Sequence, residues 1–310
     1  MLRPMQPKTK VTLATLQSWK RERRKFPVLT CYDYTTSRLM AEAGVDVILV
    51  GDTYGEVCLG HTTTLPVKID HLLTVTEAVR RGAPHAFVIG DMPYLTYQVS
   101  ATEAIRNAGR FMAEAGCDAV KLEVDRRLAG TVEALATASI PVIAHLGLKP
   151  QSIHAHGGYR AQGKDAPGAL DLVDDAALME SAGAVALLLE AVPIEVAELI
   201  AQRTTLPVIG CVAGPHCDGT VVVLHDMLGY SAGHPPRSVK RYANLHEVLT
   251  GAFREYVNDI VGEKFPTRAH GVAMPAEELE ALHDALAARA PGEPGARARR
   301  TDTAARQPLA

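Results

Sequence analysis

The sequence predicts an α/β protein, a (β/α)₈ TIM barrel with an N-terminal helix and extra C-terminal helices. Eight short runs rich in Val, Ile and Leu recur along the chain, and segments with helical spacing separate most of them. No G-x-G-x-x-G follows the first run, which argues against a doubly wound dinucleotide-binding sheet. Several runs end in a charged residue, and parallel barrels carry their chemistry at the carboxyl ends of the strands.

The first half of the chain supplies four strands. Leu13, Leu16 and Trp19 share one face of a helix that precedes the first strand and is placed to plug one end of the barrel. Gly44 and Gly116 follow two further helices, as glycine does at helix C-termini. The expected strands cover 27–32, 45–52, 87–91 and 119–123, and the expected helices cover 12–22, 35–43, 70–81 and 100–115.

The second half continues the alternation and contains a long loop over residues 146–168, after an earlier long loop over 52–66. Loops of this length within a domain are usually functional. The expected strands cover 141–145, 185–190, 207–211 and 219–224, and the expected helices cover 127–138, 169–181, 193–202, 244–261 and 276–290. We therefore divide the chain into a flexible N-terminus (1–10), a catalytic barrel (11–265), a helical extension (266–290) and a disordered tail (291–310).

Composition is that of an ordinary globular protein, with 47% hydrophobic and 22% charged residues. A net charge of −3 gives no electrostatic reason to expect nucleic acid or an anionic membrane as a partner. The five scattered cysteines favour reduced thiols over a disulfide framework. Because the N-terminus has no apolar signal core and no apolar run reaches the ~20 residues of a membrane span, we expect a soluble, cytoplasmic protein.

Three carboxylates mark a candidate metal site. Asp52, Asp91 and Glu123 end predicted strands two, three and four, which are neighbours in a barrel. Crowded carboxylates repel one another unless a cation binds them, and Mg²⁺ prefers oxygen ligands of this kind. The alternative is that each aspartate only caps the helix that follows it.

Lys121, Glu190 and His145 complete the candidate site. Lys121 lies two residues before Glu123, so both side chains point into the barrel, where a lysine needs an anionic partner. That partner is either a structural carboxylate or a substrate. Glu190 ends a leucine-rich strand and is the candidate general base. His145 ends strand five and could hydrogen-bond a substrate or only satisfy the loop around it. Signatures of zinc proteases, P-loop NTPases and serine hydrolases do not occur.

These motifs stand in the order of a known family. The matching segments are Val50–Thr53 (VGDT), Gly60–Pro66 (GHTTTLP), Ala78–Pro84 (AVRRGAP), Val120–Glu123 (VKLE), His145–Ser152 (HLGLKPQS), Gly157–Tyr159 (GGY) with Gln162–Gly163, and Leu224–Asp226 (LHD). Over roughly residues 11–262 the chain resembles the ketopantoate hydroxymethyltransferase family, within the phosphoenolpyruvate/pyruvate barrel superfamily.

The resemblance implies a Mg²⁺-dependent transferase of pantothenate and coenzyme A synthesis. Such enzymes move a hydroxymethyl group from 5,10-methylenetetrahydrofolate to 3-methyl-2-oxobutanoate (α-ketoisovalerate), giving ketopantoate through a Mg²⁺-stabilised enolate, and commonly assemble as homodecamers. By matching positions, Asp52, Asp91 and Glu123 would bind the metal. Asp52, Thr53, Asp91, Lys121 and His145 would form the keto-acid site, and Glu190 would accept the proton.

Some positions depart from the family pattern. Thr53 stands in place of a serine, Thr62 in place of an aspartate, Val212 in place of a glycine, and Ser238 in place of an aromatic residue. Three alternatives therefore stay open beside the transferase. They are a paralogue for a different 2-keto acid, a superfamily enzyme that makes or breaks a C–C or C–P bond, and a non-catalytic barrel. Neither Cys58 nor Cys117 has the mobile-loop setting that the C–C or C–P chemistry would need.

Overall fold

The computed structural model describes residues 9–231 and 239–289. Eight parallel strands close a barrel in sequential order, from β1 beside β2 to β8 beside β1. The strands are β1 (Phe26–Thr30), β2 (Val47–Val50), β3 (Phe87–Asp91), β4 (Ala119–Glu123), β5 (Val142–Gly147), β6 (Ala186–Glu190), β7 (Val208–Cys211) and β8 (Gly219–Val222). The predicted (β/α)₈ fold is confirmed.

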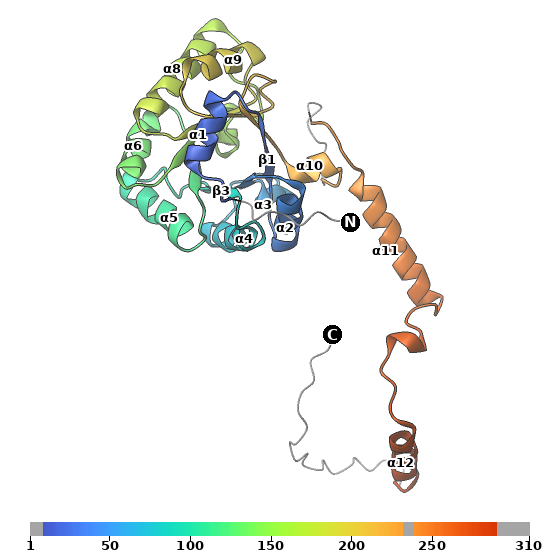
Figure 1. The fold of residues 1–310 in the computed structure, drawn as a ribbon. Helices are drawn as coiled ribbons and strands as arrows, with labels where there is room; N and C mark the ends of the chain where they lie inside the picture. The colour runs from blue at the N-terminus through green and yellow to red at the C-terminus, as the bar shows by residue number, and fades with distance from the viewer. Residues whose placement is uncertain (1–8, 232–238, 290–310) are drawn as a thin grey trace. The chain divides into compact units, whose positions relative to one another are not determined.

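The helices of the described residues include an outer ring around this sheet (Figure 1). Those of the first half are α1 (Leu13–Arg21), α2 (Tyr34–Ala43), α3 (Tyr54–Val57), α4 (Ile69–Gly82), α5 (Ala101–Ala113) and α6 (Ala129–Thr137), with the 3₁₀ turn η1 (Arg126–Leu128). Those that follow are η2 (Pro150–Ser152), α7 (Ile153–His156), α8 (Ala166–Ser181), α9 (Ile194–Arg203), α10 (Leu224–Leu228), α11 (Leu245–Val261), η3 (Arg268–His270) and α12 (Ala276–Ala287). The N-terminal helix and the extra C-terminal helices are both present.

The chain divides into two compact units, Met1–Glu247 and Val248–Ala310. The first contains the barrel. Helix α11, which begins three residues before the second unit, and helix α12 within it contain no buried residues. No helix in the described ranges is long and apolar enough to cross a membrane. Ser238, residues 1–8 of the expected flexible N-terminus, and the expected disordered tail lie outside the described residues.

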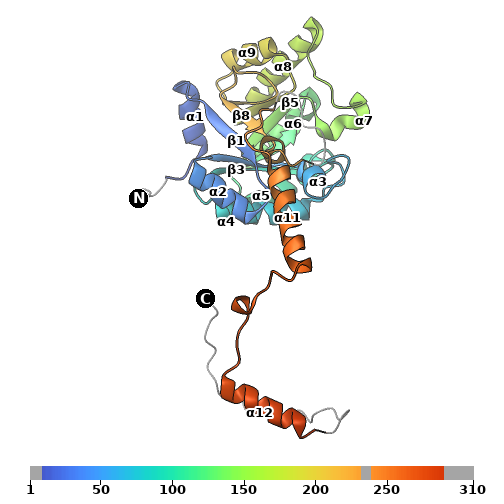
Figure 2. The ribbon, with the colours of Figure 1, turned by 90° about the vertical axis from the view of Figure 1, so that its right-hand side faces the viewer.

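Inward-facing positions of the strands form layers along the barrel axis. The lower layers are apolar and share one core with α1; they include Val47, Leu49, Phe87, Ile89, Ile143, Leu188, Ile209 and Val221, together with Leu16 and Trp19 of the helix. In Figure 2, α1 lies at one end of the barrel and α3 and α7 lie at the other. The helix over 12–22 therefore plugs the amino-terminal end, as its apolar face predicts, and leaves the carboxyl end for polar side chains.

Short helices account for the main differences from the predicted elements. The helices α3, α7 and α10 have only four or five residues each, too few to show a helical period in the sequence. Helix α8 begins at Ala166 rather than 169, because Pro167 occupies the first turn, where its missing N–H costs nothing. The long loop after β5 is thus shorter and more ordered than the sequence indicates.

Two aspartates repeat one structural role on opposite sides of the barrel. Asp118 precedes β4. Its Oδ2 accepts hydrogen bonds from the backbone N–H of Val88 in β3 at 2.8 Å and from Nζ of Lys10 at 2.7 Å. Asp218 precedes β8, and its Oδ2 accepts the N–H of Val208 in β7 at 2.9 Å and Nζ of Lys20 at 2.9 Å. Each aspartate follows a buried cysteine, and each valine begins a Val-Ile-Gly segment.

Candidate active site

Polar residues replace the apolar layers at the carboxyl end of the barrel. The inward-facing alternation of the strands continues into this end. Its residues are Asp91 in β3, Lys121 and Glu123 in β4, His145 in β5, Glu190 in β6 and Cys211 in β7. Strand pairing sets Asp91 beside Lys121, Glu123 beside His145, and Glu190 beside Cys211. Asp52 follows β2 directly. The structure therefore brings all the strand-end residues singled out from the sequence to one end of the barrel.

Asp52 and Asp91 lie in direct contact through the backbone. The N–H of Asp52 donates to Oδ2 of Asp91 at 2.9 Å, and Nζ of Lys121 lies 2.8 Å from Oδ1 of Asp91. All three side chains are buried, with relative exposures of 1–4% for the residues. Asp91 does not cap a helix: the caps of α4 and α5 belong to Lys68 and Ser100. The alternative role as a simple helix cap is therefore wrong for Asp91.

Gln151 is a site residue that the sequence reasoning missed. Its Nε2 donates to Oδ2 of Asp52 at 2.9 Å, and its backbone N–H donates to Oε2 of Glu123 at 3.0 Å. Its Oε1 accepts from the phenol of Tyr97 at 2.8 Å, which fixes the orientation of the amide. Gln151 thus joins the carboxylates of β2 and β4. The only signal for it was its place in the segment His145–Ser152, because a lone glutamine has no distinctive spacing.

Burial disfavours the ionised form of these carboxylates. It raises the pKa of Asp91 to about 8; the charge of Lys121 lowers it and that of Asp52 raises it. Burial also raises the pKa of Glu123 well above its ordinary value, again with opposition from Lys121. For Lys121, burial acts to lower the pKa, but the carboxylates of Asp91, Asp52 and Glu123 outweigh it and raise the pKa. One lysine does not balance three buried carboxylates.

This donor set fits a divalent cation in chemistry and in charge. Oε1 of Glu123 is buried and has no hydrogen-bond partner, and oxygen ligands with excess negative charge are what Mg²⁺ requires. Within the described part of the chain, no three His, Cys, Asp or Glu side chains already stand in a metal-binding arrangement. Asp91 is held by Lys121 and Asp52 by Gln151, so these contacts would rearrange when a cation binds.

His145 lies between Lys121 and Glu190. Its Nδ1 is 3.2 Å from Nζ of Lys121, and its Nε2 is 3.3 Å from Oε2 of Glu190. Burial, followed by the charge of Lys121, lowers the pKa of the imidazole, so it stays neutral near pH 7. The Glu190 side chain is 22% exposed. A carboxylate at the mouth of the barrel is thereby connected to the buried ion pair.

Gly147 lets Glu190 and His145 come together. Its φ is +94°, and a Cβ on this residue would lie 2.3 Å from the carbonyl oxygen of Glu190. The same carbonyl accepts the backbone N–H of Leu148 at 2.8 Å. The close approach of β5 and β6 therefore depends on the absence of a side chain.

The positions that depart from the family pattern are spread over the mouth. Thr53 directly follows Asp52 and precedes α3, next to the site. Thr62 is exposed on the loop after α3. Val212 follows Cys211 with φ +54°, a left-handed conformation that is rare for a β-branched residue. Cys211 itself is an inward-facing thiol whose pKa is raised well above its ordinary value by burial and then by the charge of Glu190.

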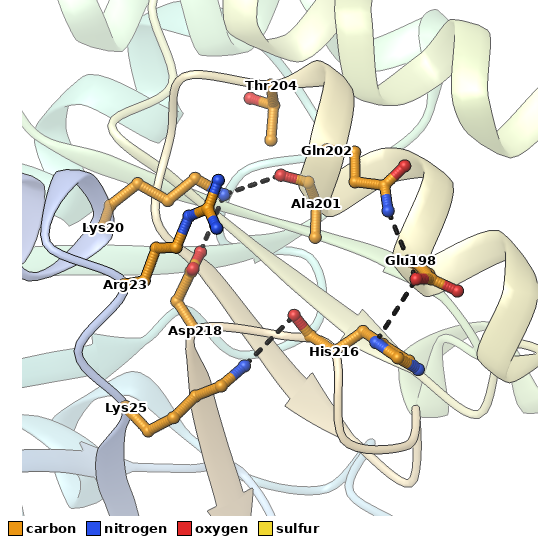
Figure 3. Close-up of a pocket in the computed structure, with 9 residues that line it drawn as sticks. All are labelled: Lys20, Arg23, Lys25, Glu198, Ala201, Gln202, Thr204, His216 and Asp218. Atoms are coloured by element: carbon orange, nitrogen blue, oxygen red, sulfur yellow. Dashed lines mark hydrogen bonds and ion pairs between the residues drawn. The ribbon is translucent and has the colours of Figure 1, made fainter.

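A cavity of about 510 Å³ lies at the amino-terminal end of the barrel, away from the candidate site (Figure 3). Its polar groups are largely satisfied by one another. Lys20 donates to the carbonyl of Ala201 and to Asp218, and Lys25 donates to the carbonyls of residues 215, 216 and 217. These contacts hold the N-terminal helix and the β7–β8 connection to the barrel, and we assign the cavity no part in the chemistry.

Comparison with known proteins places this site in a family context. Residues 10–268 match the family model described as ketopantoate hydroxymethyltransferase. A curated 3-methyl-2-oxobutanoate hydroxymethyltransferase from Halalkalibacterium halodurans is 44% identical over 272 residues, which cover 88% of this chain and 98% of that protein. Another from Syntrophomonas wolfei is 43% identical over 274 residues, covering 88% of this chain and 99% of the relative.

Solved structures with the same fold are more distant in sequence. Phosphoenolpyruvate phosphomutase from Streptomyces platensis aligns with a TM-score of 0.55 at 17% identity, over 89% of this chain and 96% of that one. A 2,3-dimethylmalate lyase, described as a member of the PEP mutase/isocitrate lyase superfamily, aligns with a TM-score of 0.54 at 18% identity, over 92% and 98%. At these identities the likeness shows the barrel fold alone.

Proposed function

The chain belongs to the ketopantoate hydroxymethyltransferase family, and we propose that it transfers a hydroxymethyl group to 3-methyl-2-oxobutanoate in pantothenate biosynthesis. The one-carbon donor is 5,10-methylenetetrahydrofolate. The observation that carries this proposal is the continuous set of contacts from Asp52 through Asp91, Lys121 and His145 to Glu190. It sets a cation-binding end next to a carboxylate that can act as a base.

Asp52, Asp91 and Glu123 would hold Mg²⁺. When bound, the cation would polarise the keto acid and make its C3–H more acidic. The three carboxylates, the divalent cation and Lys121 together carry no net charge, which suits a buried site.

The remaining roles belong to side chains around the keto acid. Lys121 faces the carboxylates and stabilises the negative charge that develops on the keto oxygen. Thr53 and His145 are the further substrate contacts that we propose, Thr53 through its hydroxyl. Glu190 removes the proton from C3, as a carboxylate within reach of bulk water at the mouth can do.

The enolate carbon then bonds to the methylene carbon of the folate. In the net reaction the C3–H bond and both N–CH₂ bonds break, one water supplies the hydroxyl, and the two folate nitrogens take up protons. One of these protons is the one that Glu190 removed from C3, and the other comes from the water. The residues of the chain therefore bind, orient and move a proton, while the folate supplies the carbon.

Deuterium exchange tests the proposal. The full chain with Mg²⁺ in D₂O should exchange the C3 proton of 3-methyl-2-oxobutanoate, and should form ketopantoate once methylenetetrahydrofolate is added. Exchange without product would indicate a different one-carbon acceptor or donor. Absence of both would leave a non-catalytic barrel as the better reading of the fold.

A different 2-keto acid is the second candidate substrate. Thr53 adds a methyl group directly beside Asp52, at the proposed keto-acid site. The same exchange assay with pyruvate and 2-oxobutanoate compares the candidates. If one of these exchanges faster than 3-methyl-2-oxobutanoate at equal concentration, the chain is a paralogue for that acid.

Self-association and location follow from the family as further proposals. We propose a cytoplasmic homodecamer. The helix α11 supports association, because Val248, Phe253, Tyr256 and Val257 give it apolar side chains that are 55–64% exposed. Light scattering on the full chain would give the mass of ten subunits; a monomer mass would exclude the assembly.

A further inference from the structure

A hydrogen bond crosses the mouth of the barrel between two loops. We propose that Tyr159 and Glu56 form a latch that closes the β5–α8 loop over the site, so that the enolate is kept for the one-carbon donor instead of being reprotonated with a solvent proton. The latch rests on the proposed function, because it acts on the enolate which that function requires.

The latch joins residues 103 positions apart. The phenol Oη of Tyr159 donates to Oε1 of Glu56 at 3.0 Å. Glu56 lies in α3, three residues after Thr53, on the rim of β2. Tyr159 lies in the loop after β5, the strand that carries His145. Since β3 and β4 separate these two strands, the bond runs across the rim next to the strands of Asp91, Lys121 and Glu123.

The other end of the same loop is attached next to the base. The backbone N–H of Gln162 donates to the carbonyl of Ala191 at 3.0 Å, and Ala191 directly follows Glu190. The segment from Tyr159 to Gln162 is therefore fixed on one side by the Asp52–Glu56 rim and on the other by the Glu190 rim. Breaking either of these two hydrogen bonds would release one end of the segment from Tyr159 to Gln162.

Electrostatic interactions connect both residues of the latch with Asp52 at one end of the site and with Glu190 at the other. Burial raises the pKa of Glu56; the hydrogen bond from Tyr159 opposes this shift, and the charges of Asp52 and Glu190 add to it. Burial and then the charge of Glu56 raise the pKa of Tyr159, to which Asp52 and Glu190 also contribute. The phenol thus remains a donor at neutral pH and faces carboxylates that belong to the site.

Two glycines give the loop room to move. Gly157 and Gly158 have φ of +67° and +125°, and no atom lies within 4 Å of the place where a Cβ would stand on either. Tyr159 itself is 49% exposed. A hydrogen bond to a charged acceptor shifts an opening equilibrium by about 10- to 100-fold. That range is suited to a gate that must also admit substrates.

The latch controls the fate of the proton on Glu190. With the loop open, the protonated carboxyl group exchanges with solvent, and return of a solvent proton to C3 gives exchange without product. With the loop latched over the bound keto acid and folate, which would cover the part of Glu190 that is exposed in the ligand-free site, the original proton stays on Glu190 until carbon–carbon bond formation. Tyr159 and Glu56 are therefore positioning residues, which act through the loop and not on the reacting atoms.

The test compares two rates in the same reaction. The full chain is assayed in D₂O with Mg²⁺, 3-methyl-2-oxobutanoate and saturating methylenetetrahydrofolate, and NMR measures C3 deuteration and ketopantoate. Tyr159→Phe, which removes only the hydroxyl, should raise the ratio of deuteration to product about tenfold or more, with little change in KM for the keto acid. Tyr34→Phe is the matched control, because Tyr34 is 50% exposed on α2.

A second pair of variants separates positioning from folding. Glu56→Gln keeps an oxygen that accepts from the phenol but removes the charge, so it should raise the ratio less than Tyr159→Phe does, whereas Glu56→Leu should raise it as much as Tyr159→Phe does. An unchanged ratio in Tyr159→Phe, or equal losses of deuteration and product, would overturn the latch. A wild-type chain that neither deuterates the acid nor forms ketopantoate would instead overturn the proposed function, and the latch with it.

Discussion

Nε2 of His145 lies 3.3 Å from Oε2 of Glu190, inside the carboxyl end of the barrel. The other ring nitrogen is 3.2 Å from Nζ of Lys121. A lysine ammonium can only donate, so Nδ1 must accept, and a neutral ring then carries its N–H on Nε2, toward Glu190. Lys121 therefore fixes the tautomer of His145 and leaves the Nε2–H on the side of the proposed base, where it is placed to orient Glu190.

Replacing His145 tests this orientation. His145→Leu should lower the rate of C3 exchange by about 10- to 100-fold, the loss typical of removing an orienting partner, while KM for the keto acid changes little. His145→Gln can accept from Lys121 and donate to Glu190 with one amide, and should recover part of the rate. The exchange assay measures both. A rise in KM at constant rate would make His145 a substrate contact only.

Glu190→Gln should abolish C3 exchange, because an amide cannot accept the proton. Keto-acid binding should remain, because Glu190 is not one of the proposed metal ligands and is connected to them only through His145 and Lys121. Calorimetric titration of the Mg²⁺-loaded variant with 3-methyl-2-oxobutanoate measures the binding, and NMR measures the exchange. Exchange at the wild-type rate would remove Glu190 as the base.

Magnesium binding should strengthen as pH rises. The pKa of Asp91 is raised to about 8 by burial, so the folded apo protein retains a proton that the unfolded chain releases. This contribution to stability is fully present below the unfolded pKa, near 4, and is lost as pH rises through about 8. Because Mg²⁺ binds ionised carboxylates, it must displace that proton.

We therefore expect the Mg²⁺-induced rise in Tm to be larger at about pH 8.5 than at about pH 6.5. Calcium at the same concentration is a useful comparison, since it also binds carboxylate oxygens but tolerates a larger and more variable coordination shell. An equal rise in Tm at both pH values would argue that the cation does not displace a proton from Asp91.

Val212→Gly should stabilise the fold by about 0.5–1 kcal/mol. A left-handed backbone costs a side-chain-bearing residue about 1–2 kcal/mol, and the greater freedom of glycine in the unfolded chain cancels part of the gain. Val212 is 44% exposed, so little apolar burial is lost. Denaturant unfolding measures the difference. Val99→Gly, at an exposed loop position without a positive φ, should instead be neutral or destabilising.

The barrel and the main site residues can both be predicted from the sequence, because both depend on the pattern of the buried strands. Buried parallel strands are nearly continuous apolar runs, so a charged residue at the end of such a run is conspicuous. Asp91, Lys121 and Glu190 all stand out in this way. Their inward orientation follows from the two-residue period of a strand, which also correctly sets Lys121 and Glu123 on one face.

The contacts that complete the site are not predictable in this way. Gln151 and Tyr159 lie in loops, where no period links the sequence to a direction in space. Gln151 reaches Asp52 across 99 positions, and Tyr159 reaches Glu56 across 103. Such pairs depend on the closure of the whole barrel. Cys211 escaped notice for a different reason: a thiol at the end of a strand resembles an ordinary core residue.

The paired aspartates below the barrel bear on how such a chain could arise. Asp118 and Asp218 make equivalent bonds to Val88 and Val208, which begin the repeated Val-Ile-Gly segments of β3 and β7. A barrel assembled by duplication of an ancestral four-stranded half would retain this repetition. By this correspondence Asp91 and Cys211 are counterparts, so the same strand-end position carries a carboxylate on β3 and a thiol on β7.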